Sequence, residues 1–129
     1  MNNYENLLKE IRDKGVEIES INDLMYINKN YKDLIPILLK YLNIFRKENE
    51  KAFIVSCLGV KGFTEATNSL INEFHNSSDN SELKWTIGNT MSLILDKNSE
   101  DAMIKIVQKK EHGDSRQMFV IALGKLKSK

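Results

Sequence analysis

A helical pattern recurs three times along this chain, with a period of about 32 residues that is typical of helix-pair repeats. The pair Leu58-Gly59 ends one apolar helical run, and Leu123-Gly124 ends another two periods later. The segment 83–91 falls between them. Helical repeats of this length fold as stacked helix pairs, because one pair alone cannot bury its apolar face. The repeat therefore predicts an all-α stack and favours binding over catalysis.

The first helices of the three pairs align in the same way. Their matching apolar positions, one period apart each time, are Leu38, Leu39 and Leu42, then Leu70, Ile71 and Phe74, then Met103, Ile104 and Val107. The second helices carry nearly continuous apolar runs at 52–58 and 118–123, and such a helix must be covered on more than one side. We therefore predict about eight helices in an α-α right-handed superhelix.

The repeats divide a single domain into four parts. We predict an N-terminal helical cap at residues 1–30 and helix-pair repeats at 31–63, 64–97 and 98–129. Pro36 falls in the first turn of the first repeat, where its missing amide donor is harmless. His112-Gly113 is expected to break the third repeat between its two helices.

Composition points to an ordinary soluble protein. The chain is 41% hydrophobic and 29% charged, and no apolar stretch approaches the roughly 20 residues that span a bilayer. The polar N-terminus does not resemble a signal peptide, and the single cysteine fits a reducing compartment, so we expect a cytoplasmic protein without membrane contact. Residues 101–129 carry seven basic and three acidic residues, which suits either an acidic partner or a solvated terminal helix.

Residues with chemical potential are few and scattered. His75 and His112 have no second ligand at metal-binding spacing, and both fall near predicted helix ends, where the helix dipole favours them. Cys57 lies inside an apolar run and is expected to be buried rather than nucleophilic. Glu100 and Asp101 are adjacent on a helix and cannot converge. We therefore predict no catalytic site, no metal and no cofactor.

Four segments together resemble HEAT-repeat proteins, of the short bacterial HEAT-like type. They are 33–39, which opens a repeat, then 52–59, 83–89 and 116–126. The form with an arginine followed by Ala-Leu-Gly is clear only in the last repeat, and the resemblance covers residues 31–129. The middle repeat departs from the pattern, because Gly88, Asn89 and Thr90 stand where Val55-Ser56-Cys57 stand one repeat earlier. Either packing is loose there, or something approaches the backbone.

The resemblance implies a class of function rather than a single activity. HEAT-like proteins are typically scaffolds with a curved binding surface, often lined by the second helices. Some bacterial members resemble immunity proteins that neutralise a toxin. Others excise alkylated bases from DNA, as alkylpurine DNA glycosylases do, and still others serve as phycobilin lyases or partner chaperones. The fold alone does not choose among these.

Our main hypothesis is a non-catalytic module that binds another protein, in its sharper form a toxin domain. The predicted partner-binding residues are on the second helices: Lys84, Trp85, Asn89, Arg116 and Gln117. Trp85 suits an interface because aromatic rings supply large contact area, although it also suits packing between repeats. Arg116 suits either partner contact or a structural ion pair between repeats.

Two other hypotheses remain open. Nucleic-acid binding needs a basic stripe that neutralises several phosphates, and only the C-terminal region concentrates basic residues. Self-association is the other, because the last helix is apolar over 118–123 and no polar helix follows it in this sequence. That hypothesis predicts a homodimer through the C-terminal repeat.

Overall fold

The computed structural model describes residues 2–27, 31–78 and 81–127, and in those ranges it contains helices and no strand. The predicted all-α class is confirmed. The α-helices are α1 (Asn3–Asp13), α2 (Ile35–Ile44), α3 (Glu48–Cys57), α4 (Thr67–Asn76), α5 (Glu82–Ile94), α6 (Glu100–Gln108) and α7 (Gln117–Lys127). Short 3₁₀ helices are η1 (Ile21–Tyr26), η2 (Lys32–Leu34), η3 (Thr64–Ala66), η4 (Lys97–Ser99) and η5 (Lys110–Arg116).

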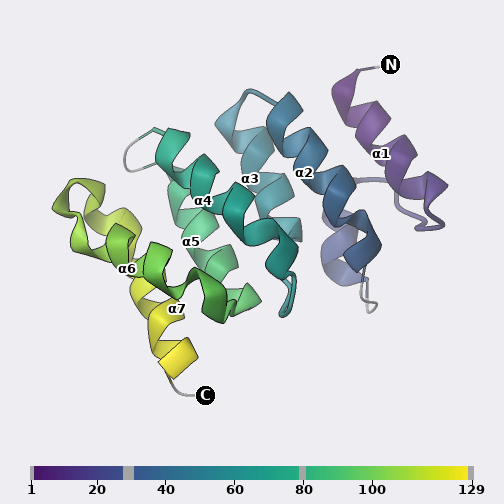
Figure 1. The fold of residues 1–129 in the computed structure, drawn as a ribbon. Coiled ribbons are helices and arrows are strands. Elements are labelled where there is room, and N and C mark those ends of the chain that lie inside the picture. Colours follow the sequence, from purple (N-terminus) through teal and green to yellow (C-terminus); the bar gives the residue numbers. More distant parts are fainter. Residues whose placement is uncertain (1, 28–30, 79–80, 128–129) are drawn as a thin grey trace.

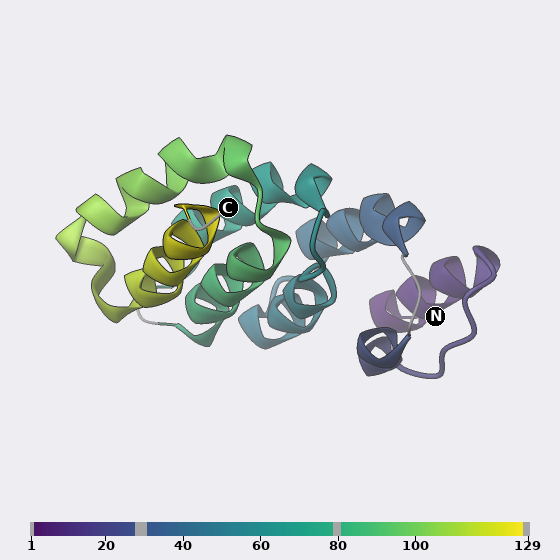
Figure 2. The same cartoon turned by 90° about the horizontal axis from the view of Figure 1, so that it is seen from below.

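The helices form two layers (Figures 1 and 2). The first layer contains α2, α4 and α6, and the second contains α3, α5 and α7. Each first-layer helix packs against the second-layer helix that follows it in the chain, and α5 packs against both α3 and α7. The molecule is therefore a row of helix pairs, with α1 at one end and α6 and α7 at the other (Figure 1).

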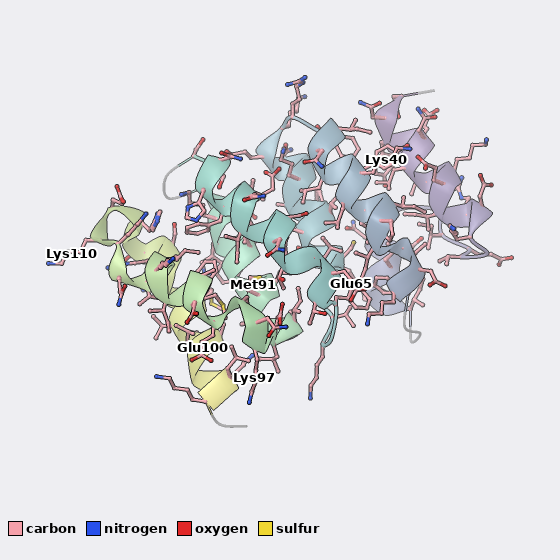
Figure 3. The ribbon with its side chains drawn as sticks, in the orientation of Figure 1. Lys40, Glu65, Met91, Lys97, Glu100 and Lys110 are labelled. Carbon is pink, nitrogen blue, oxygen red and sulfur yellow. The ribbon has the colours of Figure 1, made fainter. Side chains whose placement is uncertain are left out.

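The region predicted as a cap continues both layers. Helix α1 packs against α2, and η1 packs against α3. The cap buries Leu7, Ile11 and Leu24 in the common core. Polar contacts add to this packing: the Ile21 amide donates to the Tyr4 hydroxyl at 3.1 Å, and Arg12 Nε donates to the Ile18 carbonyl at 2.8 Å. Lys40, labelled in Figure 3, reaches from α2 to Glu10 on α1 with a 3.1 Å ion pair.

The middle repeat is closely packed, so the expectation of loose packing there is wrong. A Cβ atom added to Gly88 would lie 2.8 Å from Met118 Cβ and 3.2 Å from Phe119 Cε2. The group that approaches the backbone of α5 is therefore helix α7. On the opposite side, the hydroxyl of Thr90 donates to the Val55 carbonyl at 3.1 Å and joins α5 to α3.

The third repeat is interrupted where the sequence predicted a break. Gly113 has φ 55° and ψ −138° inside η5, a conformation that side chains with a Cβ rarely adopt. The chain turns at this glycine and begins α7 at Gln117. Segment η5 packs against both α6 and α5, so it closes the end of the stack rather than extending into solvent.

Candidate interaction surface

The second-layer helices expose apolar side chains on the side away from their first-layer partners. Phe53 on α3 is 52% exposed, Trp85 on α5 is 48% exposed and Ile121 on α7 is 47% exposed. On α5, Trp85 is aligned with Glu82 and Asn89 at spacings of three and four residues, which place side chains on one helix face. We call the residues Phe53, Glu82, Trp85, Asn89, Gln117 and Ile121 the outer face.

Three of the five predicted binding residues belong to this outer face. Trp85 and Gln117 are exposed, and Asn89 is partly exposed. Sequence reasoning missed Phe53 and Ile121, because the apolar runs around them were expected to be covered on both sides. One repeat period of 32 residues backward from Trp85 leads to Phe53, and one period forward from Asn89 leads to Ile121, so the repeat itself carried the missing signal.

Lys84 was expected to be exposed, and the structure shows that it is buried. Its side chain is 2% exposed, and its Nζ lies 4.4 Å from the centroid of the Phe74 ring. Neighbouring residues on a helix point about 100° apart, so Lys84 points toward α4 whereas Trp85 points outward. A cation over an aromatic face is attracted by the ring quadrupole, and this contact makes Lys84 part of the packing.

Arg116 is partly buried and has a structural role. Its Nε donates to the Gly113 carbonyl at 3.0 Å, and its Nη1 donates to the Val107 carbonyl at 2.9 Å. These bonds join η5 to the end of α6. The sequence reading offered partner contact or an ion pair with an acid, and the observed partners are instead backbone carbonyls.

A groove lies between α3 and α5 beside the outer face. It has a volume of about 350 Å³ and is lined by Glu48, Asn49, Ala52, Phe53, Ser56, Glu82, Leu83 and Thr86. Leu83 and Thr86 are buried and form its deep part, whereas Phe53 and Glu82 are exposed at its rim. The carboxylates of the groove are Glu48 and Glu82, and both belong to first helical turns, where negative charge stabilises the helix. The groove thus combines an apolar wall with acidic groups.

The two histidines come together at the far end of the stack. The ring centroids of His75 and His112 are 5.9 Å apart, and Phe74 contacts both rings edge to face. His112 is buried, and neither of its ring nitrogens has a hydrogen-bond partner among the described residues. Burial, followed by the nearby charge of Lys84, lowers the pKa of His112. The sequence could not predict this pair, because its members belong to different repeats.

Cys57 is buried, as predicted. Burial raises the pKa of its thiol to about 12, so almost none of it is thiolate near neutral pH. Over residues 2–27, 31–78 and 81–127, no three residues among His, Cys, Asp and Glu gather closely enough to hold a metal ion. In the same ranges, no helix has both the length and the apolar character to cross a bilayer.

Over residues 101–127, the basic residues of the C-terminal region are distributed from α6 through η5 to α7. Lys105 lies on α6, and Lys110 points outward from η5 at the edge of the molecule (Figure 3). Lys125 Nζ instead donates to the Ser92 carbonyl at 3.3 Å and joins α7 to α5. These charges are spread over three elements, and Arg116 is held by backbone carbonyls.

Comparisons with protein-family models, curated proteins and solved structures gave no match. The HEAT-like resemblance therefore stays a prediction from the residues. The structure establishes an all-α stack of helix pairs whose second layer exposes Phe53, Trp85 and Ile121 on the outer face.

Proposed function

We propose that this chain is a non-catalytic binding protein, which engages a partner protein through its outer face. The observation that supports the proposal is the exposure of Phe53, Trp85 and Ile121 on three successive helices of one layer. Aromatic side chains are enriched at interfaces, and tryptophan is among the residues that most often dominate interface energies. They lose little conformational entropy when a partner covers them, because packing already holds their helices.

The size of the outer face suits a protein partner. Packed helices lie about 8–10 Å apart, so Phe53 and Ile121 are about 20 Å apart across two helix spacings. A standard protein interface covers about 800 Å² on each partner, which is a patch of comparable width. The face is also preformed, because Gly88 lets α7 pack directly on α5.

Charge on the outer face favours protein over nucleic acid. Its one charged residue, Glu82, is acidic, and Glu48 adds a second carboxylate in the adjacent groove. Phosphate backbones are bound by rows of lysine and arginine, and none of the six residues of the outer face is basic. Nucleic-acid binding is therefore an outcome that the tests below must exclude rather than a second proposal.

The more specific form of the proposal is an immunity protein, which neutralises a toxin by covering part of it. A rigid preformed face without chemistry of its own is what such a role requires. A toxin domain encoded beside this chain should inhibit the growth of cells that express it, and co-expression of this chain should restore that growth. Restored growth with the wild-type chain, but not with the Phe53→Ala/Trp85→Ala double variant, is the expected result.

Partner binding is tested first by affinity capture with purified protein as bait. The double variant Phe53→Ala/Trp85→Ala should lose the captured protein, and the identified partner should then bind it about 30-fold more weakly in calorimetry. Tyr26→Ala is the matched control, because Tyr26 is an aromatic residue 87% exposed on η1, outside the outer face. Equal binding by both variants, with helical content intact, would show that the outer face is not the interface. Capture of nucleic acid alone would contradict the proposal.

A further inference from the structure

A protonated His112 would place a second positive charge beside Lys84 in a buried site. An imidazolium ring has two N–H donors, and both ring nitrogens of His112 are buried without an acceptor among the described residues. The ammonium group of Lys84 is already buried against Phe74, whose centroid lies 5.0 Å from that of His112. A buried group without hydrogen-bond partners costs far less free energy when it is neutral than when it is charged.

The groups that face His112 come from every element packed around it. Helix α4 contributes His75, α5 contributes Lys84, and the chain just before His112 contributes Lys109 and Glu111. Helix α7 contributes Phe119, which is uncharged and stacks edge to face on Phe74 at 4.9 Å. Among these described groups, only Glu111 favours a charged ring, and its side chain is exposed to solvent, which weakens the attraction.

We propose that His112 is an acid-sensitive latch, which holds η5 and the C-terminal helix pair closed while its ring is neutral. Protonation requires the ring to reach water, and the ring reaches water only when η5 separates from α4 and α5. Gly113, with a φ of 55° that residues with a Cβ rarely adopt, forms the turn directly beside His112 through which η5 leads to α7. Because η5 leads into α7, its release loosens the packing of α7 as well.

The direction of the effect follows from the protonation states. Burial first, and Lys84 second, lower the pKa of His112 in the folded protein below its ordinary value of 6.5. The stability contributed by the neutral ring is therefore complete above pH 6.5 and is lost as pH falls below it. Each pH unit below 6.5 raises the ratio of open to closed molecules about tenfold, until the lowered pKa is reached.

His75 acts in the same direction with a smaller effect. Its pKa is also lowered by burial and by Lys109 and Lys84, but its side chain is largely exposed. These are the only two histidines in the chain, so no side chain outside this cluster has an ordinary pKa near 6.5. If the proposed function holds, acid also weakens partner binding, because α7 carries Gln117 and Ile121 of the outer face.

The latch is tested by amide hydrogen exchange on the full chain at pH 7.5 and 5.5, corrected for intrinsic exchange rates. The opening equilibrium of amides in η5 and α7 should rise at the lower pH, with about tenfold as the upper limit for His112 alone. Amides of α1, at the opposite end of the stack, should not change and serve as the internal control. An equal rise in α1 and α7, or no rise in α7, would overturn the proposal.

Single variants distinguish the contribution of His112 to the pH effect from that of His75. His112→Phe keeps an aromatic ring beside Phe74 and removes the titrating group, so most of the pH effect should disappear. His75→Asn should retain most of it. If the larger ring disturbs folding, His112→Leu provides the same comparison. Persistence of the full pH effect without His112 would show that the latch is elsewhere. The measurement needs no partner, so its result is independent of whether the outer face binds one.

Discussion

The two ends of the stack are joined to its middle in different ways. At the N-terminal end, α1 and η1 bury Leu7, Ile11 and Leu24 in the common core. Polar contacts at the surface, such as the Tyr4–Ile21 hydrogen bond and the Lys40–Glu10 ion pair, add to this packing. At the C-terminal end, α7 lies so close to α5 that a single methyl group at Gly88 would clash. Exposed polar contacts contribute about 1 kcal/mol or less each, whereas close packing removes large apolar areas from water. Because α7 packs on α5 without space for one added methyl group, we expect this contact to contribute more to stability than the cap does, and we expect the cap to open first.

The largest expected effect is the loss of Phe119. This side chain is fully buried and contacts both Phe74 and the position of Gly88. Phe119→Ala should lower the free energy of unfolding by about 3–5 kcal/mol, measured by urea denaturation. Phe53→Ala is the matched control, since that ring is 52% exposed, and it should lose about 1 kcal/mol or less. Similar losses of unfolding free energy for both variants would show that the buried Phe119 contributes no more to stability than the exposed Phe53.

The second effect concerns two glycines on neighbouring helices. Gly88→Ala places Cβ against Met118, and overpacking of about 1–3 kcal/mol should exceed the gain of about 1 kcal/mol in helix propensity. Gly124→Ala has nothing within 4 Å of the added Cβ and should stabilise the protein by about 0.5–1 kcal/mol. Thermal unfolding of both variants checks the difference. A Gly88→Ala variant as stable as Gly124→Ala would show that α5 and α7 are not in tight contact.

The smallest effect measures the cap. Cys57 is buried where η1 meets α3, and its thiol donates to the Ile21 carbonyl at 3.7 Å, so alkylation of Cys57 reports opening of the cap. Tyr4→Phe removes the acceptor for the Ile21 amide and should cost about 1 kcal/mol, which raises the alkylation rate about fivefold. Gly88→Ala should leave this rate unchanged under native conditions. Equal acceleration by both variants would mean that the chain opens only as a whole.

Local sequence was sufficient for the helices. Apolar spacing, Pro36 at the start of α2 and Gly113 at the break in the third repeat act over a few residues, so their consequences are visible in the sequence. The repeat also indicated the outer face, since Trp85 and Gln117 are exposed as predicted. Lys84 was misplaced because helical spacing assigns residues to faces but does not say which face meets a neighbour.

Tertiary structure alone decided which distant residues meet. Phe74, Lys84, His112 and Phe119 come from four elements, and only stacking brings them into one cluster. The same is true of Gly88, which has to be small only because α7 packs directly against it. The sequence by itself determined a repeated all-α chain with an apolar second layer. The stack determined which of those residues are buried, because burial depends on neighbours that periodicity does not identify.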